Sequence, residues 1–233
     1  MRFFYSPYID SEFELPPDEA AHCFKVLRLR MNDLIDLTDG NGNIYKAEIL
    51  NINNKGCRVK VLSCNSQEKL WKGGIHVAVS PVKLMDRNEW FVEKAVEIGV
   101  DEISFIHTRY SERDSIKMER IERIAIAAMK QSFKARMPII NPIIPFSQFI
   151  LKKFEGEKFI AHCYDGEKVH LIDNVIADRK SLVMIGPEGD FSKEEVSMAI
   201  ERDYTQVSLG RFRLRTETAA VVAVHIMNIV NKI

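Results

Sequence analysis

The feature of this chain that most restricts its fold is the alternation of strand-like and helix-like segments that begins after Gly74. Residues 181–185, Ser-Leu-Val-Met-Ile, form an almost continuous apolar run, which is typical of a strand buried on both faces. Parallel strands need long crossover connections, and helices usually supply them. Because strands and helices alternate here, the sequence predicts an α/β domain with a parallel sheet covered on both faces.

Capping signals mark the helices in this part of the chain. Asp86 followed by Glu89 predicts a helix start, and Gly99 predicts the stop of the same helix. Ser192 and Glu195 form a second capping-box pattern. The final predicted helix is apolar nearly all round, so we expect it to be buried. The predicted strands are 75–79, 102–106, 158–161, 181–185 and 206–209, and the predicted helices are 86–98, 115–133, the segment after Ser192, and 218–230.

Residues 1–70 have a different sequence pattern, which predicts short β strands joined by turns. Alternating polar and apolar residues predict strands, and the Thr-Asp-Gly-Asn-Gly run at 38–42 predicts a hairpin turn. Several short strands joined by such turns suggest a small barrel. A polar stretch that ends in two glycines at 73–74 predicts a boundary, so we expect domains at 1–70 and 74–233. The predicted elements of the first domain are the strands 33–37, 44–49 and 57–62 and a short helix at 18–24.

Composition excludes several classes of protein. The 233 residues include 33 basic and 33 acidic side chains, and 46% are hydrophobic, which is too apolar for a disordered chain. No apolar run reaches roughly 18 residues, and the N-terminus lacks a signal-peptide pattern, so we expect no membrane association and a cytoplasmic location. The neutral net charge does not exclude nucleic-acid binding, which depends on where the charges lie.

The four cysteines follow no metal-binding or disulfide pattern. No pair has C-x-x-C spacing, and in a reducing compartment we expect all four to stay thiols. We therefore expect no metal site. The four are Cys23, Cys57, Cys64 and Cys163.

Two unusual loops follow predicted strands, and ligands bind at the carboxyl ends of strands in such sheets. The first loop, residues 185–191, contains two glycines that let the backbone approach a ligand, and it precedes a helix N-terminus. The second loop, residues 209–218, carries three arginines at alternate positions, which in an extended loop would place all three guanidiniums on one side to grip phosphates. A Gly-Pro-Glu-Gly turn alone is often only a turn, and an arginine-rich loop is usually solvated surface. Finding both loops after consecutive strands favours a ligand site.

Common nucleotide and hydrolase motifs do not occur in the chain. No G-x-G-x-x-G follows a strand, which leaves a nicotinamide or ordinary Rossmann site unsupported. No G-x-x-x-x-G-K-[ST] motif is present, which excludes a P-loop NTPase, and no G-x-S-x-G elbow is present either.

The two loops, taken with four other motifs in order, make the chain resemble the small-subunit ribosomal RNA uridine-N3 methyltransferase family (RsmE), of the SPOUT superfamily. The resemblance covers essentially the whole chain. The sequence departs from the family pattern at three places. It has Asp114 where the family often has Ser, no tryptophan near 120–124, and Asp190 in place of a common Gly. The matching segments are 20–22 with 26–28, Lys83 with 86–90, Lys94 and 97–100, 111–113, 127–132, 185–192 and 209–219.

The resemblance implies a SPOUT-type parallel sheet with a C-terminal deep trefoil knot, preceded by a PUA-like barrel. Knots are rare exceptions to the usual topology of chains, and pattern reading does not reveal them. The resemblance also implies S-adenosylmethionine as methyl donor, a homodimer, and 16S ribosomal RNA or the small ribosomal subunit as partner. The implied product is 3-methyluridine in the decoding region. The alternatives are a related enzyme that methylates another base or a ribose 2′-hydroxyl, and a non-catalytic RNA-binding assembly factor.

The implied cofactor site lies in the knot loops, which should hold the cofactor mainly through backbone groups. Ile185 and Leu214 would sandwich the adenine. His162 is either a cofactor contact or a strand-end histidine bonded to backbone. The full cofactor set comprises His162, Ile185, Gly186, Glu188, Gly189, Leu209, Gly210, Leu214 and Thr216.

Methylation at N3 of uridine requires removal of the N3 proton, or stabilisation of the developing anion. Glu217 is the expected base, with Glu188 as the less favoured one, and Arg215 would stabilise negative charge on the uracil oxygens. Glu217 could instead be a helix N-terminal residue favoured by the macrodipole, and Arg215 its ion-pair partner. A uridine in folded RNA must be extruded, so flanking RNA needs basic contacts. The expected RNA contacts are Lys25, Arg28, Arg30, Arg113, Arg136 and Arg211.

Overall fold

The computed structural model of the chain describes residues 2–69 and 71–232. Its contacts divide the chain into two compact units. The first comprises Met1–Lys69 and Met129–Met137, and the second comprises Leu70–Ala128 and Pro138–Ile233. The predicted domain ends at 1, 70 and 233 lie outside the described residues.

The first unit is built on a five-stranded sheet with the order β1-β3-β4-β5-β2. The antiparallel neighbours β3, β4 and β5 confirm the three predicted strands, while the two edge strands were missed because each has only three residues. Closure of this sheet into a barrel stays a prediction. The strands are β1 (Phe3–Tyr5), β2 (Glu12–Glu14), β3 (Leu34–Thr38), β4 (Asn43–Ile52) and β5 (Cys57–Ser66).

Two non-strand segments complete the first unit. Helix α1 (Pro17–Ala21) continues into a π-helical turn, His22–Val26, so the short predicted helix exists but changes its winding partway. Residues 129–137 belong here because the Thr38 hydroxyl donates to the carbonyl of Ala135 at 3.0 Å, and the Lys130 ammonium pairs with Glu19.

The second unit contains a seven-stranded sheet with the order β10-β12-β9-β11-β6-β7-β8, and every neighbouring pair is parallel. This confirms the predicted α/β class and its parallel sheet. Strand β8 was missed because two prolines interrupt its pattern, and prolines are confined to positions such as edge strands. The strands are β6 (Gly74–Val79), β7 (Glu102–His107), β8 (Ile139–Pro145), β9 (Glu157–Ala161), β10 (Val169–His170), β11 (Lys180–Ile185) and β12 (Thr205–Ser208).

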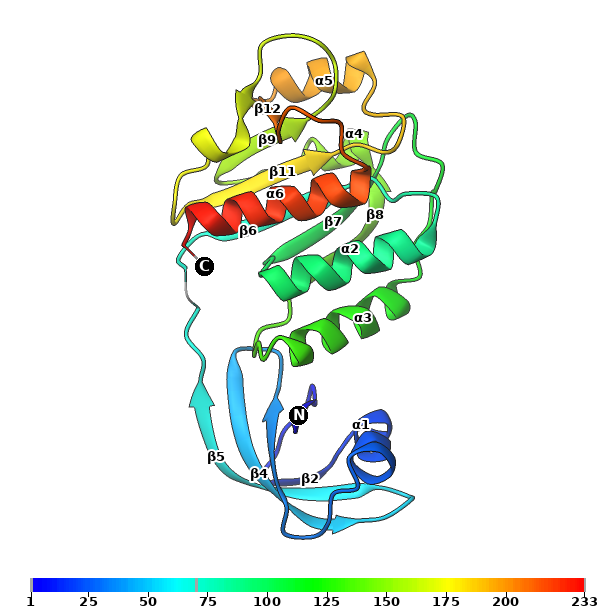
Figure 1. Cartoon of the computed structure of the whole chain (residues 1–233), viewed down its shortest axis with the longest axis vertical. Helices are drawn as coiled ribbons and strands as arrows, with labels where there is room; N and C mark the ends of the chain where they lie inside the picture. The colour runs from blue at the N-terminus through cyan, green and yellow to red at the C-terminus, as the bar shows by residue number, and fades with distance from the viewer. Residues whose placement is uncertain (1, 70, 233) are drawn as a thin grey trace. The chain divides into compact units, whose positions relative to one another are not determined.

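Helices cover both faces of this sheet. Leu182 and Met184 of β11 pack with residues of α4 and α5 in one buried cluster, while α6 packs on β6 and β11 from the other face, with α2 beside it (Figure 1). No helix of the described residues is long and apolar enough to cross a membrane. The helices are α2 (Met85–Ile98), α3 (Met118–Gln131), α4 (Phe146–Phe149), α5 (Lys193–Ile200) and α6 (Thr216–Val230), with a 3₁₀ turn at Leu171–Asp173.

Two expectations about the helices are wrong. Helix α2 has Leu84 at its N-cap without a capping side chain, and the buried Asn88 bonds both the N–H and the carbonyl of Val82 instead, at 2.9 and 2.8 Å. Helix α6 is not wholly buried, because His225 and Ile229 are exposed on the side turned away from the sheet. Apolar composition alone therefore overstated the burial of α6.

The predicted capping box of α5 is confirmed, and it yields a stability prediction. The Ser192 hydroxyl accepts from the Glu195 N–H at 3.2 Å, and the Glu195 carboxylate accepts from the Ser192 N–H at 2.8 Å. Replacing Ser192 with alanine leaves a buried N–H without its acceptor, and should lower the free energy of unfolding by about 1 kcal/mol. Denaturant titration measures this, and an unchanged midpoint would show that the cap contributes nothing.

Candidate active site

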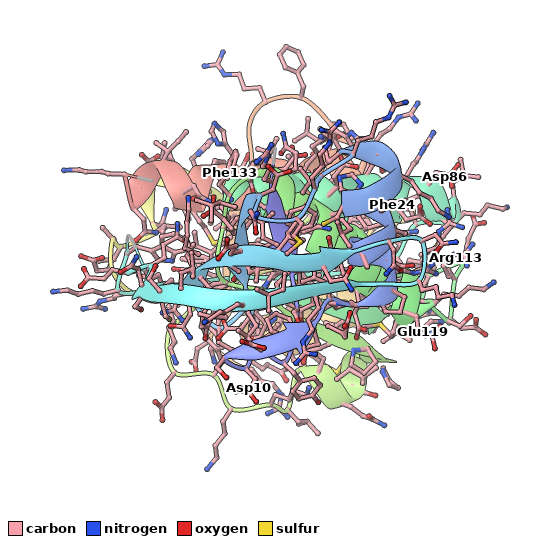
Figure 2. The ribbon with its side chains drawn as sticks, turned by 90° about the horizontal axis from the view of Figure 1, so that it is seen from below. Asp10, Phe24, Asp86, Arg113, Glu119 and Phe133 are labelled. Carbon is pink, nitrogen blue, oxygen red and sulfur yellow. The ribbon has the colours of Figure 1, made fainter. Side chains whose placement is uncertain are left out.

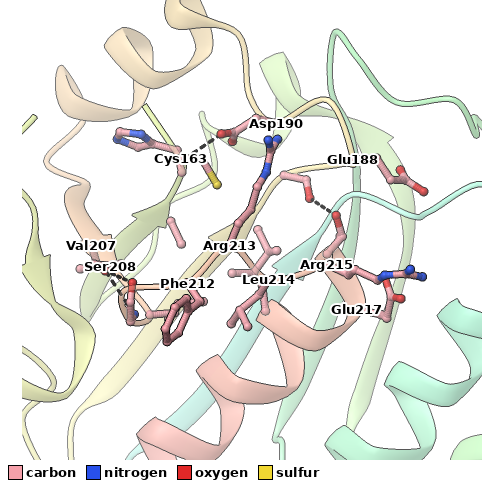
Figure 3. Close-up of a pocket in the computed structure, with 18 of the residues that line it drawn as sticks. Cys163, Glu188, Asp190, Val207, Ser208, Phe212, Arg213, Leu214, Arg215 and Glu217 are labelled. Atoms are coloured by element: carbon pink, nitrogen blue, oxygen red, sulfur yellow. Dashed lines mark hydrogen bonds between the residues drawn. The ribbon is translucent and has the colours of Figure 1, made fainter. Parts of the chain in front are cut away.

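The carboxyl ends of β9, β11 and β12 surround a pocket of about 850 Å³ (Figure 3). Its walls come from the loop after each strand, from the first turn of α6, and from Arg87 of α2. Parallel strands bring their carboxyl ends to one edge of the sheet, which is why loops distant in sequence meet here. The pocket therefore lies where the two unusual loops were expected to form a site.

The pocket contains most of the residues selected from the sequence and leaves out others. From the cofactor set, Gly189 does not line it. From the RNA set, only Arg211 does. The predicted site residues that line the pocket are His162, Ile185, Gly186, Glu188, Leu209, Gly210, Arg211, Leu214, Arg215, Thr216 and Glu217.

Hydrogen bonds tie the three loops together. The Thr216 hydroxyl donates to the carbonyl of Gly186 at 3.0 Å, which joins the start of α6 to the loop after β11. The Asp190 carboxylate accepts from the N–H of Cys163 at 2.7 Å, which joins that loop to the one after β9. Asp190 has φ +65°, a conformation that glycine, aspartate and asparagine adopt most readily. The pocket walls are thus linked to one another as well as to the sheet.

The packing of the protein accounts for two of the loop glycines. A Cβ on Gly186 would lie 3.0 Å from the Phe191 backbone nitrogen, and one on Gly189 would lie 2.9 Å from Cβ of Tyr110. These two glycines are therefore required by the packing of the protein itself. Gly210 differs, because it has φ +137° and open space where a Cβ would be.

Glu217 is fixed by a residue to which the sequence analysis gave no role. Its side chain is 9% exposed, and one carboxylate oxygen lies 3.6 Å from Nη1 of Arg87. Among the described residues, the ion pair of Glu217 is therefore with Arg87 rather than with Arg215. Arg87 lies about 130 residues earlier in the chain, within one of the motifs that carry the family resemblance. Its place in that motif was the only sequence signal for it.

The three arginines of the second loop do not share one side. Figure 3 shows Arg213 directed toward Asp190 and Cys163, and Arg215 directed toward Glu217. The prediction from alternation was wrong because the loop is not a straight extended segment; its backbone bends at Arg211 and Phe212. Burial and the Asp190 charge raise the pKa of the Cys163 thiol, and the Arg213 charge opposes that shift.

His162 is held by side chains and loop contacts. Its Nε2 lies 2.9 Å from the Gln206 side-chain oxygen, and its carbonyl accepts from the Lys168 ammonium at 3.0 Å. Burial lowers the pKa of His162, which keeps the ring neutral at pH 7. The expected bond from the ring to backbone is thus replaced by one to a side chain of β12.

The basic residues chosen as RNA contacts divide into free and engaged groups. Lys25, Arg28 and Arg30 are exposed in the first unit, on and after the helical segment that also exposes Phe24 (Figure 2). Arg113 donates to the carbonyl of Lys83 at 2.7 Å, and Arg136 donates to the carbonyl of Asn41 at 3.1 Å. The last two guanidiniums therefore support backbone as well as carrying charge.

Comparison with known proteins identifies the family. The RNA methyltransferase domain matches residues 69–228, and the RNA methyltransferase PUA domain matches residues 15–62. The chain belongs to the RNA methyltransferase family. This confirms the resemblance drawn from the loop motifs.

Within residues 2–69 and 71–232, no cluster of three or more His, Cys, Asp or Glu side chains is placed to hold a metal ion.

Individual relatives match the chain over nearly its whole length. A probable rRNA methyltransferase from Porphyromonas gingivalis is 42% identical, with a TM-score of 0.95 over 100% of this chain and 99% of that one. The ribosomal RNA small subunit methyltransferase E of Neisseria gonorrhoeae, bound to S-adenosylmethionine, is 27% identical. Its TM-score is 0.88 over 98% of this chain and 97% of that one. The enzyme of the same name from Rickettsia conorii is 29% identical over 92% of this chain and 88% of its own length.

Proposed function

We propose that this methyltransferase uses S-adenosylmethionine to methylate N3 of a uridine in the decoding region of 16S ribosomal RNA. The observation that carries the proposal is the pocket formed by the Gly-Pro-Glu-Gly loop and the Arg-Leu-Arg-Thr-Glu-Thr loop. The Neisseria gonorrhoeae relative, which matches both units, is named a ribosomal RNA small subunit methyltransferase and binds S-adenosylmethionine.

The pocket residues fit S-adenosylmethionine. A volume of about 850 Å³ falls within the range of small-molecule sites, and the apolar side chains of Ile185 and Leu214 suit an adenine ring. Backbone around Gly210 is open to a ligand because no neighbour lies within 4 Å of the missing Cβ. The cofactor, when bound, supplies an electrophilic methyl group on a sulfonium.

The remaining chemistry belongs to side chains of this protein. Glu217 would accept the N3 proton of the uracil, and its ion pair with Arg87 would hold the carboxylate in one orientation. Arg215, exposed at the start of α6, would donate to the uracil oxygens as negative charge develops there. The proton thus moves to Glu217 while Arg215 stabilises the anion.

We also propose the larger architecture that the resemblance implies. The chain would form a deep trefoil knot at the three loops that meet in the pocket, and a cytoplasmic homodimer. The exposed side of α6, with His225 and Ile229, supports a homodimer interface. The unit that matches the PUA domain would bind RNA through Lys25, Arg28 and Arg30, with Arg113, Arg136 and Arg211 adding contacts.

Nucleoside mass spectrometry of 16S ribosomal RNA tests the function. RNA from a strain lacking the gene should contain no 3-methyluridine, and a plasmid copy of the gene should restore it. Loss of a different methylated base or of a 2′-O-methyl nucleoside would assign the enzyme to that reaction instead. An unchanged set of nucleosides, with no calorimetric binding at millimolar S-adenosylmethionine, would leave a non-catalytic RNA-binding factor.

A further inference from the structure

Phe212 is one of the most exposed large apolar side chains of the described residues, with 87% of its surface accessible. It lies in the loop between β12 and α6, directly between Arg211 and Arg213, and lines the rim of the pocket. We infer that Phe212 is a stacking platform for an unpaired RNA base that flanks the target nucleotide. This inference rests on the proposed function and adds a substrate contact that no motif of the sequence analysis supplied.

The loop that carries Phe212 is anchored at both ends and projects between them. At its start, the Ser208 hydroxyl accepts from the N–H of Gly210 at 3.2 Å and donates to its carbonyl at 3.0 Å. At its end, Thr216 is bonded to Gly186. The aromatic ring is thus held on a defined short loop without being packed against the protein. Because the loop is anchored at both ends, its backbone loses little conformational freedom when the ring binds.

The charges around Phe212 suit RNA. Arg211 and Arg213 are both exposed, and no carboxylate occurs in the loop from 209 to 216. Aromatic rings that stack on splayed-out bases, together with guanidiniums that contact phosphates, are the usual means of binding single-stranded RNA. A base extruded into the pocket leaves its neighbours unpaired at the rim, within reach of such a ring.

Two other binding partners for Phe212, the cofactor and a second copy of the chain, fit its surroundings less well than RNA does. A residue that contacts the cofactor would be expected to be partly covered, as the half-buried Leu214 is, whereas Phe212 is almost wholly exposed. A second copy of the chain, meeting this loop across a two-fold axis, would bring two pairs of guanidiniums together and incur repulsion. An RNA strand instead supplies the opposite charge.

Phe212→Ala and Phe212→Trp test the inference, with Leu151→Ala as the matched control. Leu151 is also exposed and apolar in the second unit, at 61%, but it does not line the pocket. Filter binding would measure the affinity for unmodified 16S RNA and for small subunits from a strain lacking the gene. Loss of one stacked base should weaken RNA binding about 5- to 150-fold in Phe212→Ala. Phe212→Trp and Leu151→Ala should keep the wild-type affinity.

Two further readouts separate the possible outcomes. The added indole of Phe212→Trp should lose fluorescence when RNA binds, and calorimetry should show unchanged S-adenosylmethionine affinity in Phe212→Ala. Unchanged RNA affinity in Phe212→Ala overturns the inference. A loss of S-adenosylmethionine affinity or of the oligomeric state, in place of a loss of RNA affinity, also overturns it. The proposed function fails separately, if the wild-type protein binds RNA in a Phe212-dependent way but methylates none.

Discussion

Replacing Glu217 with glutamine is expected to lower the rate of methylation by about 10²- to 10⁴-fold, the usual contribution of a positioned general base. Glutamine keeps the size of the side chain and can still contact Arg87, but it cannot accept the N3 proton. The affinity for S-adenosylmethionine should stay unchanged, because other groups of the pocket loops would hold the cofactor. Single-turnover rates at saturating cofactor, with calorimetry on the same samples, measure both quantities.

Control variants distinguish the base from a residue that only stabilises the helix. A helix N-terminal carboxylate contributes about 0.3–1 kcal/mol to stability, so in that case Glu217→Gln would lower the unfolding midpoint and leave turnover intact. Glu188→Gln removes the other candidate, an exposed carboxylate that accepts from the N–H of Lys83 at 3.2 Å. If Glu188→Gln abolishes turnover and Glu217→Gln does not, the proton acceptor is Glu188.

The sheet and the edge where its pocket lies could be predicted because each depends on local pattern. The apolar run in β11 and the capping box of α5 are signals within a few residues, and both appear in the structure. The edge strands of the first unit and the edge strand β8 could not be predicted, since a three-residue strand or one containing prolines carries no clear period. The edge where the loops meet follows from the parallel order of strands, which the alternation of elements already indicated.

The partners within the site could not be predicted, because they come from distant segments. Arg87 reaches Glu217 only because α2 packs beside α6, and spacing along the chain says nothing about that contact. The direction of the loop arginines depends on the path of the backbone, which bends at Arg211 and Phe212, so the alternation rule failed there. Half of the residues that line the pocket were thus selected from the sequence, while the others and the pairing required the fold.

Gly210→Val is expected to reduce the affinity for S-adenosylmethionine by more than about 10-fold. Gly210 has φ +137°, which a β-branched residue cannot adopt without strain of about 1–3 kcal/mol. The loop would relieve this strain by changing its path, which would break the bonds between Ser208 and Gly210 and move Leu209 and Leu214 away from the cofactor. The effect is thus expected from altered backbone and not from a clash, since nothing lies within 4 Å of the added Cβ. Calorimetric titration with S-adenosylmethionine measures it.

Gly166→Val supplies a matched control within the same unit. Gly166 has φ +134° and equally open surroundings, but it does not line the pocket. Both substitutions should therefore introduce similar backbone strain, and only the one at Gly210 should weaken cofactor binding. Equal losses of affinity would mean that general destabilisation is responsible, and wild-type affinity in Gly210→Val would show that the cofactor does not depend on the path of this loop. Gly210 separates β12 from the arginine-bearing loop. A loss of affinity in Gly210→Val alone would therefore link backbone conformation at one residue to recognition of the methyl donor.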